Sequence, residues 1–315
     1  MNVQRHPKLR LALRVLFYAF IVAVAWMLLR AARAVDWTAV GHALASYDAR
    51  TLAIALLLTA TSYLVYSCYD VAARGYAGHA LPARQVLSIT AVAYAFALSI
   101  GAAVGGAGFR LRMYARAGLA IGKVTRIIAF AVATNWLGYA VLAGALFASG
   151  RLVPPPAWKV STSGLQALGF ALLAIAIAYL VACRLTHGRV FHVRGHHFRL
   201  PSLRLAFLQV ALATVNWTLM GTLLWLLLPR VPWPLALGAL LLASVATALA
   251  HIPSGIGVLE AVVVAMLGGL RPEPQVLAGV LAYRACYYLL PLLLAVLAFG
   301  FSEWKRRGET VSPRA

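Results

Sequence analysis

The stretch HIPSGIGVLE, residues 251–260, interrupts a long apolar run near the end of the chain. A proline and two glycines so close together break a helix, and the carboxylate of Glu260 follows the break. Broken backbone at membrane depth is tolerated only where protein or a wet cavity covers it. An ionisable residue there is costly, so it marks a candidate functional site. The stretch therefore predicts a re-entrant hairpin with Pro253, Gly255 and Gly257 at its turn and Glu260 in a site.

The composition of the whole chain is that of a polytopic membrane protein. Of its 315 residues, 63% are hydrophobic and only 11% are charged, whereas soluble domains are about 25% charged. The long continuous apolar runs disfavour an outer-membrane barrel, whose strands alternate in polarity. We therefore predict an all-α polytopic membrane protein in which residues 1–315 form one integral membrane domain. Residues 1–10 and 302–315 would be short cytoplasmic tails.

The placement of basic residues orients the predicted helices. Lys and Arg collect on the cytoplasmic side, so the basic ends of the chain place both termini in the cytoplasm. If segment 86–109 crossed the membrane, the dense basic run 110–126 would lie outside. A second re-entrant hairpin avoids this conflict, and the four glycines between residues 101 and 108 permit its turn. The prediction is about six transmembrane helices plus two re-entrant helical hairpins, 86–109 and 235–270, which enter from opposite faces. The predicted spans are residues 11–29, 52–73, 126–148, 165–183, 205–228 and 276–301.

Two similar strings accompany the two hairpins. They are residues 131–136 and 211–217, which end in Asn135-Trp136 and Asn216-Trp217. Opposed broken helices in two halves of a chain are typical of transporters built from inverted repeats around a midplane site. A chance similarity between alanine-rich helices is the alternative, and the sequence leaves both open.

Two opposite charges inside the predicted membrane region are expected to meet each other or water. They are Glu260, just after the break, and Arg284, well inside the last span. One interpretation is a gate or headgroup site in which Arg284 holds a lipid phosphate, and the other is a structural ion pair that fixes the hairpin. Tyr287 and Tyr288 share a helical face with Arg284 and would add hydroxyl groups to a polar pocket, unless they only pack.

The first hairpin supplies further candidates. Arg110 and Arg112 follow its glycines, and with nearby backbone amides they would cradle an anion such as a lipid phosphate. The rival interpretation is a positive-inside anchor. Asp70 ends the second span one helical turn before Arg74, which favours a salt bridge between them. A site for ion or proton coupling at Asp70 is the alternative.

Other chemistries have little support in the sequence. Four histidines between residues 187 and 197 have no carboxylate or cysteine beside them, so we expect a basic headgroup-binding loop and no metal site. Phosphate-binding loops, nucleophile elbows and zinc-protease motifs are missing, and seven acidic residues leave little for acid–base chemistry. We therefore expect no cofactor and no enzymatic activity. The net charge of +21 reflects cytoplasmic loops, and no nucleic-acid-binding motif accompanies it.

Two stretches of this sequence resemble the membrane domain of lysylphosphatidylglycerol synthase/flippase proteins. These are residues 252–261 and residues 281–284, with the sequence Leu-Ala-Tyr-Arg. The glycine-rich hairpin with its two following arginines and the Tyr69-Asp70 ending of the second span also resemble that family. Ser254 stands where the family usually has glycine after the proline. The resemblance covers nearly the whole chain and implies a flippase-like fold linked to moving aminoacylated phospholipids between leaflets. It also implies a stand-alone member without the soluble domain that transfers the aminoacyl group.

These observations lead to one expected function and one alternative. The expected function is a lipid flippase or transporter that moves a phospholipid or other amphipathic lipid across the bacterial inner membrane. The headgroup of an anionic or modified phospholipid would pass between the hairpins, near Glu260, Arg284, Arg110 and Arg112. The alternative is a non-catalytic membrane scaffold that partners a lipid- or glycan-modifying enzyme.

Overall fold

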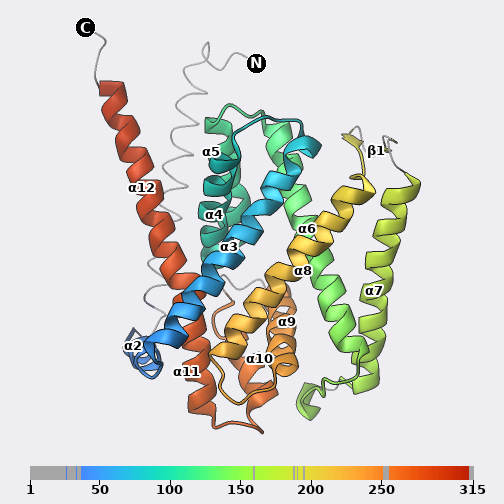
Figure 1. Cartoon of the computed structure of the whole chain (residues 1–315), viewed down its shortest axis with the longest axis vertical. Helices are drawn as coiled ribbons and strands as arrows, with labels where there is room; N and C mark the ends of the chain where they lie inside the picture. The colour runs from blue at the N-terminus through green and yellow to red at the C-terminus, as the bar shows by residue number, and fades with distance from the viewer. Residues whose placement is uncertain are drawn as a thin grey trace.

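The chain folds into a bundle of long helices, which confirms the predicted all-α polytopic membrane protein (Figure 1). The computed structural model describes residues 26, 33, 37–158, 160–186, 189, 191–193, 196–250 and 255–311. Within these residues, seven helices are long and apolar enough to cross a membrane. The predicted first span, 11–29, and Pro253 lie outside the described residues, apart from Trp26 in that span.

The helices that run from one end of the bundle to the other match the predicted spans. They are α3 (Ala49–Ala77), α6 (Ile121–Ala148), α7 (Thr162–Leu185), α8 (Leu203–Leu226) and the continuous run of α11 (Glu273–Arg284), η5 (Ala285–Leu289) and α12 (Leu290–Val311). Short elements connect them. These are α2 (Trp37–Ala45), the 3-10 turn η3 (Pro156–Trp158) and two antiparallel strands, β1 (Phe191–Val193) and β2 (His196–Phe198). The strand pair lies in the loop between α7 and α8, which the sequence predicted to be a basic headgroup-binding loop.

Local sequence signals set the ends of these helices. The side chains of Asp48, Ser161 and Ser202 accept hydrogen bonds from backbone N–H groups in the first turns of α3, α7 and α8. Such caps satisfy amides that have no partner within the helix. Gly78 ends α3 in the left-handed conformation, with φ +69°, which suits a residue without Cβ.

Two helices turn back inside the molecule, as the sequence predicted. Helix α4 (Ala83–Ile100) is followed by the π-helix η2 (Ala102–Gly108), which packs against it, and by α5 (Phe109–Arg116). Helix α9 (Trp233–Ala250) likewise packs against α10 (Val258–Leu267). Both α4 and α9 have 18 residues, but Figure 1 shows the first hairpin in the upper half of the bundle and the second in the lower half. The hairpins therefore enter from opposite ends.

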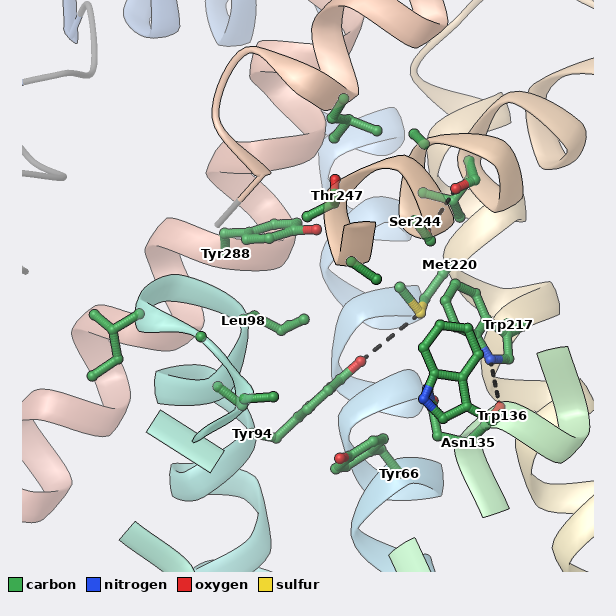
Figure 2. Close-up of a pocket in the computed structure, with 18 of the residues that line it drawn as sticks. Tyr66, Tyr94, Leu98, Asn135, Trp136, Trp217, Met220, Ser244, Thr247 and Tyr288 are labelled. Atoms are coloured by element: carbon green, nitrogen blue, oxygen red, sulfur yellow. Dashed lines mark hydrogen bonds between the residues drawn. The ribbon is translucent and has the colours of Figure 1, made fainter. Parts of the chain in front are cut away.

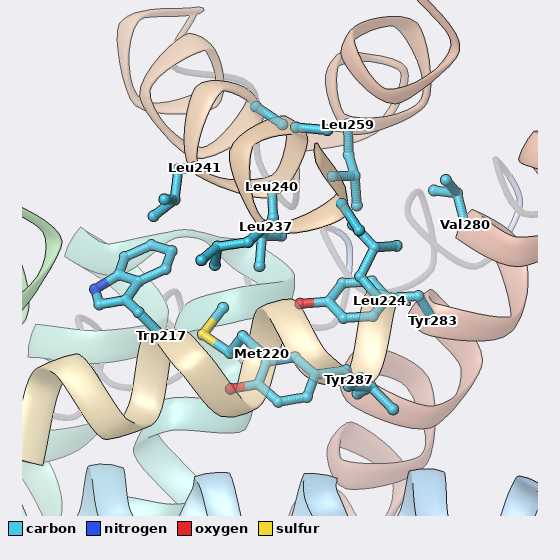
Figure 3. Packing of buried hydrophobic residues seen from close by; sticks show 14 of the residues in the cluster. Trp217, Met220, Leu224, Leu237, Leu240, Leu241, Leu259, Val280, Tyr283 and Tyr287 are labelled. Atoms are coloured by element: carbon cyan, nitrogen blue, oxygen red, sulfur yellow. The ribbon is translucent and has the colours of Figure 1, made fainter. Parts of the chain in front are cut away.

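The second hairpin rests on a close-packed apolar layer. Figure 3 shows Leu237 and Leu240 of α9 facing Met220 and Leu224 of α8. A Cβ added at Gly221 of α8 would lie 2.4 Å from a methyl carbon of Leu237, so the two helices approach closely because that residue is glycine. Packing by small residues is the usual means of helix association in membranes.

The turn of the first hairpin also depends on glycine. Gly101 has φ +100°, which other residues rarely adopt, and a Cβ at Gly105 would lie 2.1 Å from the carbonyl oxygen of Phe96. We expect Gly105→Ala to lower the free energy of unfolding by about 1–3 kcal/mol, since backbone must move apart. Gly122→Ala is the matched control, because a Cβ added there would have no other atom within 4 Å. Equal unfolding temperatures for both variants in detergent would contradict the close approach.

Candidate functional site

A cavity of about 600 Å³ lies where the two hairpins approach each other. Ligand pockets in proteins range from about 300 to 1,000 Å³, so this volume is that of a small-ligand pocket. Residues from both hairpins line it. The first contributes Ala97, Leu98 and the turn from Ile100 to Val104, and the second contributes Leu240, Ala243, Ser244, Thr247, Ala248 and Leu259.

Aromatic side chains from the long helices complete the cavity wall. These are Tyr66 of α3, Trp136 of α6, Trp217 of α8 and Tyr288 of η5, together with Tyr94 of the first hairpin. Figure 2 shows Tyr94 directing its hydroxyl toward Met220 of α8, a residue far from it in the sequence. The lining is therefore mostly apolar and aromatic, with the hydroxyls and amide of a few side chains for orientation.

The two similar strings found in the sequence converge on this cavity. Asn135 and Trp136 line it, as does Trp217, whose indole N–H donates to the carbonyl oxygen of Asn135 at 3.1 Å (Figure 2). Asn216 lies behind the wall and accepts a hydrogen bond from Ser62 at 2.7 Å. Helices α6 and α8 therefore cross beside the site with corresponding motifs in contact.

Glu260 and Arg284 form the ion pair that the sequence predicted. The guanidinium binds both carboxylate oxygens, one through Nε and the other through Nη2 at 2.9 Å. Arg284 Nη2 also donates to the carbonyl oxygen of Gly255 at 2.8 Å, and Glu260 accepts from the backbone N–H of Gly257 at 2.9 Å. The Glu260–Arg284 pair therefore connects the backbone of Gly255 and Gly257 in the second hairpin to the last span.

The glycines of this break have conformations that require glycine. Gly255 has φ +56° and Gly257 has φ +84°. A Cβ at Gly255 would lie 2.5 Å from the hydroxyl oxygen of Thr247, which lines the cavity. Gly255 is thus packed directly behind the cavity wall, in keeping with the rule that non-helical backbone at membrane depth is covered by protein.

The predicted salt bridge between Asp70 and Arg74 is wrong, because Asp70 pairs with Arg110 instead. Arg110 donates to the two carboxylate oxygens at 2.9 and 3.3 Å, and Thr90 and Tyr114 donate to the same carboxylate at 2.8 and 3.0 Å. The side chains of Asp70 and Arg110 are 0% and 4% exposed. The helical spacing alone favoured Arg74. Because the first hairpin returns, however, Arg110 of α5 reaches Asp70 of α3 and forms a buried ion pair with it.

None of the predicted site residues that the structure describes lines the cavity. Arg110 is held by Asp70, and Arg112 lies over the ring of Phe299, 5.3 Å from its centre. Tyr287 is fully buried and its hydroxyl bonds those of Ser62 and Tyr94. Tyr288, which the sequence placed on the same helical face, does line the cavity, and the guanidinium of Arg284 lies 5.5 Å from its ring centre. It belongs to the π-helical turn η5, which no pattern in the sequence predicted.

Sequence reasoning missed most of the residues that line the cavity. Tyr66, Tyr94, Met220, Ser244 and Thr247 lie in apolar helices where aromatic and small polar residues are common. Two signals pointed to lining residues: the similar Asn-Trp strings, which contain Asn135, Trp136 and Trp217, and the helical face of Arg284, which includes Tyr288. Among the described residues, no group of three or more His, Cys, Asp or Glu side chains could hold a metal ion.

His79 follows α3 at the basic end of the molecule. Its pKa is lowered, first by burial and then by the positive charges of Arg74 and Lys123. The folded protein thus favours neutral His79, whereas an unfolded histidine has a pKa of about 6.5. We expect stability to fall as the pH drops below about 6.5, since the unfolded state then binds the proton more readily. Unfolding temperatures at high and low pH should differ less in His79→Gln than in the wild type, and equal differences would contradict this.

Comparisons with known proteins place this chain among membrane proteins. A family model described as the lysylphosphatidylglycerol synthase TM region matches residues 11–295. Inner membrane protein YbhN of Escherichia coli (strain K12) is 42% identical over 296 residues, which cover 93% of this chain and 93% of that protein. The protein slr0712 of Synechocystis sp. is 31% identical over 256 residues, which cover 80% of this chain and 79% of that protein.

Proposed function

Because the chain belongs to the lysylphosphatidylglycerol synthase transmembrane family, we propose that it moves a phospholipid or other amphipathic lipid between the leaflets of its membrane. The polar headgroup occupies the cavity between the hairpins while the acyl tails stay in the surrounding lipid. The function is transport without a chemical change of the lipid.

The observation that carries this proposal is the cavity between two opposed hairpins. Each hairpin occupies one half of the bundle, and the cavity is lined by residues of both, such as Gly101 and Ser244. Transporters with broken helices bind their substrates at such midplane positions, and access alternates when one element moves against the other. The ion pairs Asp70–Arg110 and Glu260–Arg284 hold one hairpin each, so they are suited to control such a movement.

Charge and the relatives support a proposal for the membrane and for the orientation. We propose the bacterial inner membrane, since YbhN is named an inner membrane protein. Both termini would lie in the cytoplasm. The sequence near the N-terminus is basic, and the basic connections between α5 and α6 and between α7 and α8 lie at the same end of the bundle as the end of α12. Transport would be passive or coupled to an ion, with Asp70 as the candidate coupling group.

Leaflet exchange of fluorescent phospholipids in proteoliposomes tests the proposal. Ser244→Trp fills the cavity with an indole, and we expect exchange to fall to the rate of protein-free vesicles. Ser244 suits this change because its hydroxyl bonds only to its own helix, at the carbonyl oxygen of Leu240. Ile175→Trp is the matched control, since Ile175 of α7 is 62% exposed and does not line the cavity.

Two results would count against transport. Exchange by Ser244→Trp at the wild-type rate would exclude the cavity as the path. Absence of exchange by folded wild-type protein with every lipid tried would favour the alternative, a scaffold for a lipid- or glycan-modifying enzyme. That alternative predicts a stable partner that copurifies with the full chain.

A further inference from the structure

The cavity lining contains no acidic or basic side chain among the described residues. Polar atoms in its wall belong to hydroxyl and amide side chains, such as Ser244, Thr247 and Asn135. A headgroup with a net positive charge would therefore meet no counter-charge on entering. An unpaired charge in a membrane interior is costly.

The two carboxylates nearest to this region are already fully engaged. Both oxygens of Asp70 accept hydrogen bonds, from Arg110, Thr90 and Tyr114. Both oxygens of Glu260 accept from Arg284, and one also accepts from the backbone of Gly257. Neither carboxylate can receive an ammonium group without first losing its arginine.

The arginines of these two ion pairs lie directly behind the cavity wall. The guanidinium carbon of Arg110 is 5.5 Å from the ring centre of Tyr66, and that of Arg284 is 5.5 Å from the ring centre of Tyr288. Both rings line the cavity. In each ion pair the guanidinium therefore packs on a ring of the wall. A ring that already binds a cation attracts a second one less well, because the first cation offsets the negative electrostatic potential of the ring face.

From this arrangement we infer that the cavity selects an anionic phospholipid headgroup, a phosphate diester with an uncharged alcohol, and disfavours the cationic aminoacyl derivative of the same lipid. The inference rests on the proposed function only in treating the cavity as the headgroup site. The charge of the whole chain, +21, adds a field of the same sign. The aminoacylated lipid in the family's name is thus the lipid that this cavity disfavours.

The aromatic side chains of the wall argue against this selectivity, since aromatic cages bind cations. Tyr66 is poorly suited to such a cage, because Tyr94 stacks on it at 3.6 Å between ring centres and Arg110 lies over it as well. The indoles of Trp136 and Trp217 are not covered by an arginine in the described contacts. They would have to bind an ammonium group without help from any carboxylate.

Binding of two short-chain lipids to the detergent-solubilised full chain tests the inference. The probes are dioctanoyl phosphatidylglycerol and its lysyl ester, which share the phosphate and differ by the added cationic group. We expect phosphatidylglycerol to bind at least about tenfold more tightly in calorimetric titrations. Ser244→Asp places a carboxylate in the cavity, and it should reduce or invert this ratio. Ser244→Asn has a similar size without the charge, and it should keep the wild-type order.

Each outcome decides the inference. Equal or tighter binding of the lysyl ester by the wild type would overturn it and favour a cation site at Trp136 and Trp217. Binding of neither probe, or a ratio unaffected by Ser244→Asp, would overturn it because the cavity would then not be the selective site. Tight binding of phosphatidylglycerol without leaflet exchange would refute translocation and leave the selectivity standing, so the two proposals fail in distinguishable ways.

Discussion

Replacing Arg110 with methionine is expected to lower the free energy of unfolding by about 3–5 kcal/mol, because it leaves a buried carboxylate without its counter-charge. Methionine fills similar apolar space, so the loss reflects the charge more than the packing. Asp70 is completely buried, and Thr90 and Tyr114 alone would then have to stabilise it. Reversible unfolding in mixed detergent micelles measures the effect.

The double variant Asp70→Asn, Arg110→Met is the control for this prediction, and its free energy of unfolding is compared with that of Arg110→Met. Removing both charges leaves no uncompensated ion, so we expect the double variant to be markedly more stable than Arg110→Met alone. Arg74→Met is a second control, since Arg74 does not pair with Asp70. If Arg74→Met were as harmful as Arg110→Met, the pairing seen in the structure would be incorrect.

Replacing Arg284 with methionine is expected to cost about 3 kcal/mol of stability and to stop leaflet exchange. The substitution leaves Glu260 unpaired and also removes the donor to the carbonyl oxygen of Gly255, so the break loses its connection to the last span. Because the pair is partly exposed, with side chains 8% and 19% accessible, its loss should be less severe than that of the Asp70–Arg110 pair. Unfolding and exchange are measured on the same preparation.

The variant Glu260→Gln separates stability from transport. Glutamine still accepts from the backbone of Gly257 but carries no charge, so we expect a smaller loss of stability than for Arg284→Met together with impaired exchange. The double variant Glu260→Gln, Arg284→Met should regain part of the stability. If that double variant exchanged lipids at the wild-type rate, the pair would have only a structural role.

Much of the architecture was predictable because membranes impose strong rules on sequence. Long apolar runs must be helices, and basic segments must stay on one side. Together these rules required the first hairpin at residues 86–109, and the Pro-Gly break required the second. The resemblance based on residues 252–261 and 281–284 is confirmed by the match to the family over residues 11–295.

The partners of the charged residues were less predictable. Glu260 and Arg284 could be paired because few charges lie in the apolar runs and opposite charges there must compensate each other. For Asp70 there were two candidate partners, Arg74 and Arg110, and helical spacing favoured Arg74. The choice of Arg110 depends on how closely α5 returns to α3, and sequence spacing contains no information about that distance.

By itself, the sequence determined the class of protein, the two broken helices and the glycines at their turns, since each follows from local chemistry in a bilayer. Only the tertiary structure decided what the hairpins enclose. Tyr66, Trp136, Trp217 and Tyr288 come from four different helical elements, and each resembles an ordinary packing residue within its own segment. They become one cavity wall because helix packing brings distant segments together, and the same packing buries Tyr287 while Tyr288 faces the cavity.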